Sequence, residues 1–493
     1  MSFNTRVLAL LVLTLATSAC GKKGDTKSPG GKGLTVEEAE KKRTQAQKDA
    51  KARTLTGLAN EDLAKGRWKS AMDRAKRALE AEPNNAEAFA VLGAANWRAG
   101  DFEASTKAYK EALELDGKNF GAAVGLGRNY QAAGDHLAAI ELQDKILAGE
   151  PNQLDPLLCK LWSYYALADA GNSVKTLDQL FKQVEQENPV RPLLLSLAAF
   201  MRPLEGKGEL IKVEGAKGTS DLQIDPAQGL KHSGGTVGKE FTRIVFFELR
   251  EEARIHKALA DQLKLAELGK ITPAGAAAET SVVLIPEIKF GDLKLTNIPA
   301  IVDDLSPYNV GEVPGVVLGR QAMNKIGAIT FDFPSATLQL EAAAPAAAPA
   351  GASEAPLLMI DMHLLIAPAT TVSIDGSEFK FYAWFGGSYG SSLAVARKEF
   401  LKSGHLPREL EQLDDPNAGL KMVYVDKVTV GNTPLKGGVG GLVLTGTPPD
   451  AALGQIVNGS SFELGGYINM SLLRTMKVTY ALSKGKVYLS ARG

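Results

Sequence analysis

The 493-residue sequence predicts a multidomain protein: an N-terminal α-solenoid of paired helices, followed by two mainly-β lobes. Three observations predict this order. Small residues and turn glycines recur with a period of 34 residues between positions 50 and 200. After Gly208 the pattern changes to short apolar runs separated by Gly and Pro, which is typical of strands. An Ala/Pro-rich stretch then divides the β-rich part into two units of similar size.

The charges balance, with 56 Lys and Arg against 56 Asp and Glu, so the overall charge does not indicate nucleic-acid binding. The two cysteines, Cys20 and Cys159, are too few for a disulfide framework. None of the five histidines has a second ligand-type residue at metal-binding spacing, and no Gly-rich phosphate-binding motif is present. We therefore expect no nucleic-acid partner, no metal and no cofactor.

The N-terminus has the pattern of a secretory signal. Arg6 precedes an apolar run from Val7 to Ala16, which is too short to span a bilayer. Thr17-Ser-Ala-Cys20 follows, and it resembles the box of bacterial lipoproteins. The resemblance implies a signal peptide at 1–19, a lipid on Cys20 and a location in the cell envelope, anchored to the membrane and facing the periplasm. The alternative is a plain signal peptide cut after Ala19. Residues 20–35 are rich in Gly, Lys, Ser and Pro and predict a flexible tether.

Residues 36–200 are predicted to form helical repeats. Gly66, Gly100 and Gly134 follow one another in steps of 34 residues and predict the turn between the two helices of each unit. The pattern resembles the tetratricopeptide repeat, with units near 52–85, 86–119 and 120–153 and a degenerate fourth unit near 154–190. One unit cannot bury its apolar face alone, so three or more must stack.

The tetratricopeptide resemblance implies a protein or peptide partner on the concave face of the array. By the family's pattern that face carries four candidate residues: Asn60, Trp97, Arg128 and Gln131. The alternative is that Trp97 packs in the core and that Arg128 is a solvated surface charge. Cys159 lies in an apolar helix, which favours a buried, unreactive thiol.

The first β-rich unit is predicted at 205–343. It should contain a strand at 241–247, a helix at 251–265 and strands at 281–285 and 288–295. Residues 315–319 should lead into a short helix, and 326–333 with 337–340 should form a closing hairpin. A linker is predicted at 344–357.

The second unit, at 358–493, repeats this pattern. It predicts a hairpin at 372–381 with its turn at Asp375-Gly376, a loop at 384–388 and a helix at 393–401. A strand at 423–430, a short helix at 468–473 and a closing hairpin of 476–480 with 486–489 should follow.

The order of elements in both units resembles the retropepsin-like lobe of aspartic proteases, whose catalytic loop reads Asp-Thr-Gly-Ala-Ser. In the second unit the five corresponding positions are Trp384, Phe385, Gly386, Gly387 and Ser388. In the first unit the loop positions are Phe247, Glu248, Leu249 and Arg250. The turn glycine is kept in the second unit only, and the aspartate is absent from both.

Aspartic protease chemistry needs two carboxylates that share one proton at close range. We therefore expect no enzyme, but a lipid-anchored pseudoprotease that acts as a binding or scaffold protein through its repeats. One alternative is a divergent aspartic peptidase that takes its carboxylates from Glu248, Asp361 or Asp375. Another is a spacer in which the lobes form no cleft.

Overall fold

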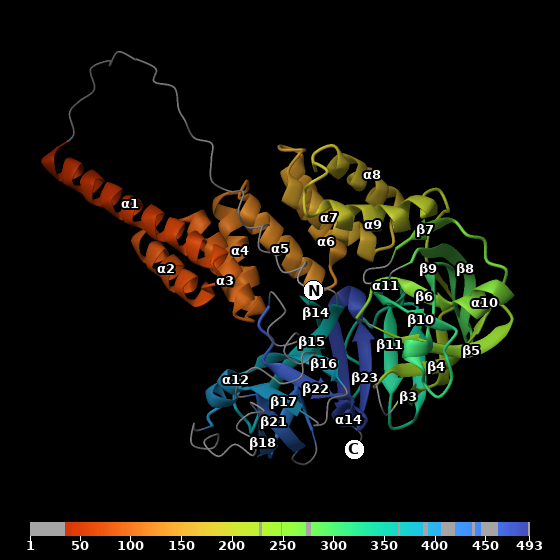
Figure 1. The fold of residues 1–493 in the computed structure, drawn as a ribbon. Coiled ribbons are helices and arrows are strands. Elements are labelled where there is room, and N and C mark those ends of the chain that lie inside the picture. Colours follow the sequence, from red (N-terminus) through yellow and green to blue (C-terminus); the bar gives the residue numbers. More distant parts are fainter. Residues whose placement is uncertain are drawn as a thin grey trace. The chain divides into compact units, whose positions relative to one another are not determined.

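The computed structural model describes residues 35–225, 229–247, 249–272, 278–362, 365–387, 393–405, 420–435, 439–444 and 462–491. The predicted signal peptide, Cys20 and all of the tether except Thr35 lie outside the described residues, as do Glu248 and Ser388. The chain divides into two compact units. The first contains the residues up to Leu126 with 187–190, and the second contains 127–186 with 191–493. The predicted change from helices to strands is confirmed (Figure 1).

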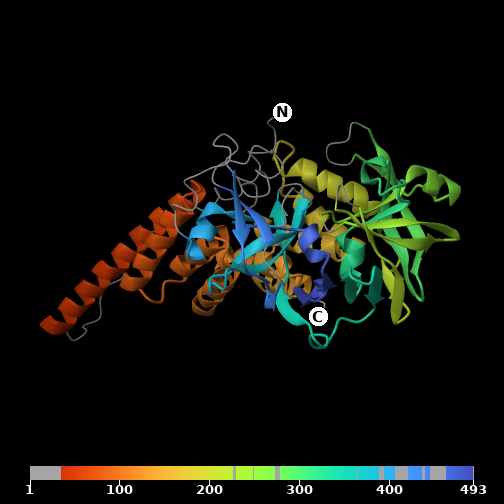
Figure 2. The same ribbon diagram turned by 90° about the horizontal axis from the view of Figure 1, so that it is seen from below.

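The first unit consists of antiparallel helix pairs. Its helices are α1 (Val36–Ala64), α2 (Trp68–Ala81), α3 (Ala86–Arg98), α4 (Phe102–Leu115) and the first half of α5 (Phe120–Ala132). Gly66 and Gly100 have φ values of +73° and +77°. A residue with a side chain adopts such values only at an energetic cost, so the backbone of these turns favours glycine. The first half of α1 extends beyond α2, and residues 36–48 are exposed (Figure 1 and Figure 2).

The second unit begins with the remaining repeat helices: the end of α5, then α6 (His136–Leu147), α7 (Leu154–Ala166), α8 (Ala170–Phe181) and α9 (Arg191–Met201). The fourth repeat keeps the 34-residue step at its turn, because Ala168 has φ +54° where Gly134 has φ +75°. Asp169 caps α8 through the backbone N–H of Asn172 at 3.0 Å, as Asp135 caps α6 through that of Ala138 at 3.1 Å.

The first lobe is built on a nine-stranded sheet. Along the sheet the main order is β1-β9-β6-β10-β5-β4-β8-β7, with β3 paired to β4. Strand β10 lies at its centre, parallel to β5 and antiparallel to β6. The strands are β1 (Lys212–Glu214), β3 (Gln223–Ile224), β4 (Lys231–Val237), β5 (Glu240–Phe246), β6 (Ala253–His256), β7 (Gly269–Ile271), β8 (Thr280–Phe290), β9 (Leu293–Asp303) and β10 (Val316–Leu318). Helix α10 (Lys257–Gln262) follows β6, and α11 (Arg320–Lys325) follows β10.

The second lobe has the same topology in the central strands of its sheet. Its main order is β18-β21-β17-β22-β16-β15-β19-β20, with β22 parallel to β16 and antiparallel to β17. The strands are β14 (Leu358–Met362), β15 (Leu365–Ile374), β16 (Phe381–Gly387), β17 (Leu393–Ala396), β18 (Leu420–Val425), β19 (Val428–Val430), β20 (Thr433–Pro434), β21 (Val439–Leu444) and β22 (Gly466–Asn469). Helix α12 (Arg397–Lys402) corresponds to α10, and α14 (Met470–Leu473) corresponds to α11.

The two lobes share a third, six-stranded sheet. Its order is β13-β24-β23-β11-β12-β2, formed by β13 (Ser353–Pro356), β24 (Lys486–Ala491), β23 (Met476–Ala481), β11 (Ala328–Asp332), β12 (Thr337–Glu341) and β2 (Lys217–Asp221). At its centre β11 of the first lobe pairs antiparallel with β23 of the second, and Thr330 Oγ1 lies 2.9 Å from Thr479 Oγ1. The sheet therefore relates the lobes by a pseudo-twofold axis.

Aromatic side chains repeat this symmetry in the core. The ring of Phe246 lies 5.8 Å from that of Phe331, and the ring of Phe385 lies 5.9 Å from that of Tyr480. Phe331 and Tyr480 meet at 5.5 Å across the axis. The buried Lys231 ammonium lies 5.3 Å from the centre of the Phe331 ring and 5.9 Å from that of Tyr480. Cation–π attraction therefore adds to apolar burial where the lobes meet.

Several predicted elements differ from the structure. The helix predicted at 251–265 is strand β6 followed by α10, and the helix predicted at 393–401 is β17 followed by α12. In both places apolar residues recur with a helical spacing across a strand–helix junction, while strand pairing, including that with β10 or β22, holds residues 253–256 and 393–396 extended. The predicted strand at 423–430 is divided into β18 and β19, and the predicted linker ends in β13.

The repeats of the second unit pack against the shared sheet. The turn at Ala133-Gly134 lies on the hairpin turn between β23 and β24, where a Cβ on Gly134 would be 2.1 Å from the Leu482 carbonyl oxygen. A Cβ on Gly485 would be 2.2 Å from the Ala133 carbonyl oxygen. Glycine is therefore needed on both sides of this contact.

Replacing Gly485 with alanine should weaken this packing. Its φ of +58° costs an alanine about 1 kcal/mol, and the clash with Ala133 should raise the total loss of unfolding free energy to about 3 kcal/mol. The matched control is Gly376→Ala, because Gly376 has φ +77° and a Cβ there would meet no atom within 4 Å. Urea unfolding checks the difference, and equal losses for the two variants would contradict the close contact.

Candidate functional site

The loop predicted at 247–250 is filled by apolar packing at its first position. The Phe247 ring meets the Tyr308 ring edge-on at 5.3 Å. Below them, buried Leu230, Val245, Leu305 and Val317 form one cluster, against which Phe247 and Tyr308 pack. This position therefore contributes a hydrophobic contact and no group that can transfer a proton.

Arg250 and Glu251, at the end of this loop, form backbone hydrogen bonds with α11. The backbone N–H groups of Arg320 and Gln321 donate to the carbonyl oxygens of Arg250 and Glu251, at 2.8 and 2.9 Å. Gly319 permits this approach, since a Cβ there would lie 2.4 Å from two carbonyl oxygens of the loop. The Arg320 guanidinium also forms an ion pair with Glu251, and their side chains are 6% and 10% exposed. A pair this deeply buried fixes the loop, because either charge alone would be costly.

Helix α7 of the repeats covers the same loop. The buried Tyr165 hydroxyl donates to the Glu252 carboxylate, and Gln321 Nε2 donates to the Tyr165 carbonyl oxygen at 2.7 Å. Burial and the nearby Glu252 raise the pKa of Tyr165 well above its usual range, so the phenol stays a hydrogen-bond donor. The loop thus serves as the docking surface for a repeat helix.

In the second lobe the strand register corrects the predicted loop at 384–388. Trp384 pairs with Ala369 and Tyr467 inside β16, is 6% exposed, and lies in no loop. Because β5 and β16 have equivalent places in their sheets, Val245 corresponds to Trp384 and Phe246 to Phe385. Phe247 follows Phe246 directly, whereas the register of β16 shifts between Phe385 and Gly387, so Gly386 and Gly387 together occupy the corresponding place. Neither Trp384 nor Phe385 therefore corresponds to Phe247.

Of the three carboxylates considered as substitutes for the aspartates, Asp375 and Asp361 lie in the described part of the second lobe, and Glu248 lies outside the described residues. Asp375, at φ +51° in the turn before Gly376, accepts from the Lys427 backbone N–H at 3.0 Å and lies 2.9 Å from His405 Nε2. It holds two turns together. Asp361 lies in β14 opposite Ile366. Among the residues that the structure describes, no group of three His, Cys, Asp or Glu side chains is placed to hold a metal ion.

The candidate partner-binding residues fall in both units. In the first, Asn60 Nδ2 donates to Glu87 Oε1 at 3.0 Å, and the half-buried Trp97 lies 6.5 Å from the Phe102 ring. In the second, Gln131 Nε2 donates to Cys159 O and Ser163 Oγ of α7, at 2.6 and 2.8 Å. Gln131 thus joins helices α5 and α7.

Arg128, one turn before Gln131 on α5, is exposed. Its positive charge opposes the rise that burial causes in the pKa of Asp155 on α7. Cys159, in the same helix, is buried, and burial raises the pKa of its thiol to about 12, so the predicted unreactive character follows. Arg128 is therefore, like Asn60, a candidate whose side chain is accessible to a partner.

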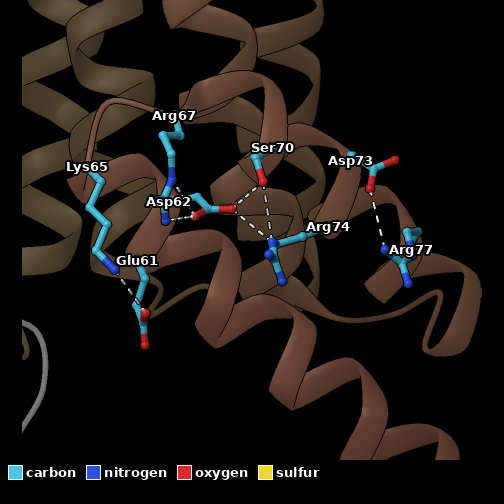
Figure 3. Close-up of polar contacts among 8 residues, drawn as sticks. All are labelled: Glu61, Asp62, Lys65, Arg67, Ser70, Asp73, Arg74 and Arg77. Carbon is cyan, nitrogen blue, oxygen red and sulfur yellow. Dashed lines mark hydrogen bonds and ion pairs between the residues drawn. The ribbon is translucent and has the colours of Figure 1, made fainter.

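A buried carboxylate that the sequence pattern did not predict, Asp62, connects α1 to α2. Asp62 is 2% exposed and accepts hydrogen bonds from Ser70 Oγ, from Arg67 Nε at 3.0 Å and from Arg74 Nε at 2.8 Å (Figure 3). The hydrogen bonds from Ser70 and Arg67 lower the pKa of Asp62 to about 2. The sequence signal that could have indicated these ion pairs is an acidic residue near the end of α1 followed by Arg67 and Arg74.

A second buried polar residue, His136, begins helix α6. It is 7% exposed, and burial, with a contribution from the nearby Arg320 charge, lowers the pKa of its imidazole to about 3. His136 is therefore neutral in the folded protein at physiological pH.

No family model matches the chain. It is 26% identical over 160 residues to the transcriptional regulator HilA of Salmonella typhimurium, in a match that covers 32% of this chain and 28% of the regulator. The chain thus spans less than a third of the length of that relative. No described helix is long and apolar enough to cross a membrane.

Among solved structures, a tetratricopeptide repeat protein from Parabacteroides merdae is 22% identical, with 31% of this chain and 60% of that chain covered at a TM-score of 0.27. A thermophilic tetratricopeptide-repeat protein of Thermus thermophilus is 17% identical, with 32% and 84% covered at 0.27. The first such domain of Spaghetti, bound to an HSP90 peptide, is 22% identical, with 24% and 98% covered at 0.23. Each match concerns at most a third of this chain. The part of this chain that resembles them consists of the helix pairs, whose turns recur with a 34-residue step.

Arg320→Met should destabilise the second unit by about 3 to 5 kcal/mol, because it leaves Glu251 buried without its partner. The double variant Arg320→Met/Glu251→Met removes both charges and should lose less than the single variant. Urea unfolding of both variants and of Glu251→Met alone checks this. Additive losses would contradict a coupled, buried ion pair.

His136 should make the stability depend on pH. Its pKa is about 3 when folded and about 6.5 when unfolded, so below about pH 6.5 only the unfolded chain binds this proton. The unfolding free energy should therefore fall as pH decreases from about 6.5 toward 3, with a contribution of about 1.4 kcal/mol per pH unit. His136→Gln should remove this part of the slope in urea unfolding between pH 4 and 8. Parallel curves for the two proteins would contradict the assignment.

Proposed function

We propose that this chain is a lipid-anchored binding or scaffold protein of the cell envelope. Its repeat array binds a protein or peptide partner, and its two lobes are a retropepsin-like pseudoprotease without catalytic aspartates. The observation that carries the proposal is that the loop after β5 in the first lobe is occupied by internal packing. Phe247 packs on Tyr308, Arg250 and Glu251 form hydrogen bonds with α11, and Glu252 accepts a hydrogen bond from Tyr165 of α7.

The retropepsin-like assignment is supported by three features of the lobes. Both have the same order of central strands, both place a short helix directly after the central strand, and both contribute a hairpin to one shared sheet. In an aspartic protease two such lobes bring their loops together across a pseudo-twofold axis. The absence of the acid follows from the sequence, since Phe247 stands at this place in the first lobe and Gly386 with Gly387 in the second.

Membrane attachment is supported by the sequence before Cys20, with the tether between the lipid and the repeats. Several acyl chains on one residue anchor a protein stably, where a single chain is marginal. Labelling of the chain by a radioactive fatty acid, and its loss in Cys20→Ser, is the corresponding measurement.

Partner binding is supported by the repeats and by Arg128. A guanidinium exposed on a helix surface can bind a carboxylate through two parallel hydrogen bonds, so an acidic peptide suits it best. Arg128 lies in the unit that also contains both lobes. A peptide held at Arg128 would therefore bind one helix away from the residues of α7 that contact the covered loop.

One experiment tests binding and catalysis together. The chain from residue 21 onward is immobilised and incubated with a peptide library at acid and neutral pH, and mass spectrometry identifies retained and cleaved peptides. Intact acidic peptides should be retained, about tenfold less by Arg128→Glu, a loss of roughly 1.4 kcal/mol. Lys239→Glu, on an exposed hairpin turn, is the matched control.

Cleavage that pepstatin blocks would contradict the pseudoprotease and favour a divergent peptidase. Equal retention by the wild type and Arg128→Glu would contradict the binding surface.

A further inference from the structure

The pseudo-twofold axis of the shared sheet creates two equivalent corners. Strand pairing relates them, because β2 lies on β12 as β13 lies on β24, and β11 crosses β23 at the axis. The first corner is formed by Leu222, Ile224, Phe333 and Arg474. The same positions in the second corner, by register, are Leu357, Met359, Leu482 and Lys325.

The second corner is covered by the repeats. The Ala133-Gly134 turn lies on Leu482, and α7 packs against α11, whose last residue is Lys325. Leu357, Met359 and Leu482 are consequently buried, with 1%, 9% and 3% of their surfaces exposed.

The first corner cannot accept the same turn. Ala336 stands where the second corner has Gly485, and both residues have a left-handed backbone, with φ of +50° and +58°. The methyl group of Ala336 occupies the space that Gly485 leaves for the Ala133 carbonyl. Ile224 and Phe333 remain half-buried, and the corner is a pocket of about 360 Å³.

The pocket combines three apolar side chains with one positively charged side chain. Leu222, 4% exposed, Ile224 and Phe333 give it apolar walls, and Phe333 is held by stacking on Phe331 at 6.1 Å. Arg474, which is exposed, also lines the pocket and is its one charged residue among those described. None of the described lining residues is acidic. The volume is within the range of small-molecule sites, about 300 to 1,000 Å³.

We propose that this pocket binds a small aliphatic carboxylate, of the class of medium-chain fatty acids. The alkyl chain lies against Leu222, Ile224 and Phe333, and the carboxylate accepts hydrogen bonds from Arg474. The buried Lys231 ammonium, on the strand that pairs with Ile224, adds positive potential on the same side of the sheet. This site is separate from the repeat surface and does not depend on the proposed function.

The test is a calorimetric titration of the chain from residue 21 onward with decanoate, decanol and a peptide ending in a free leucine. Decanoate should bind, and decanol about tenfold more weakly. Arg474→Gln should weaken decanoate about tenfold, as expected for a lost charge-assisted hydrogen bond, and Ile224→Asp should abolish binding. Lys325→Gln changes the equivalent position of the covered corner and should leave the affinity unchanged.

Three results would overturn the proposal: no binding of decanoate, equal affinity for decanoate and decanol, or equal affinity in Arg474→Gln and the wild type. Binding of the peptide without binding of decanoate would also overturn it and would assign the pocket to a peptide C-terminus. Circular dichroism of each variant shows that it is folded before it is titrated.

Discussion

The antiparallel pairing of β11 with β23 is the interaction on which most other features of the second unit depend. Each strand belongs to the closing hairpin of one lobe, so their pairing makes two nine-stranded lobes into one body with six shared strands. It brings Phe331 and Tyr480 together and places Lys231 over both rings. Such long-range pairing costs loop entropy, which the burial of the aromatic side chains offsets.

The pseudo-twofold symmetry is broken where the repeats attach. Gly485 allows the Ala133-Gly134 turn to approach one corner, and Ala336 prevents it at the other. On the attached side, α7 also reaches the loop after Phe247, where Tyr165 bonds to Glu252 and Arg320 pairs with Glu251. The loop after Phe247 is thus used for internal packing between the first lobe and a repeat helix.

Much of this fold could be predicted from residue patterns with local causes. The 34-residue step, the turn glycines and the closing hairpins are set by backbone conformation and short-range burial, and the structure contains all of them. The strands β6 and β17 could not be predicted in this way, because long-range pairing with β10 and β22 overrides a helical spacing of apolar residues. The loop position predicted for Trp384 is wrong for a related reason: the Gly386-Gly387 pair indicates a turn, whereas pairing with β15 and β22 places Trp384 inside β16. The contacts of Tyr165 and Gly134 join residues more than 80 positions apart, which no local pattern encodes.

Native-state hydrogen exchange of the backbone amides tests most directly whether the lobes form one body through β11 and β23. We predict that β11 and β23 exchange together and are the slowest strands of the shared sheet, while the edge strands β2 and β13 exchange faster. Fast exchange of β11 and β23, or two separate opening free energies for the two hairpins, would contradict this pairing as the central constraint and would show that the lobes open independently.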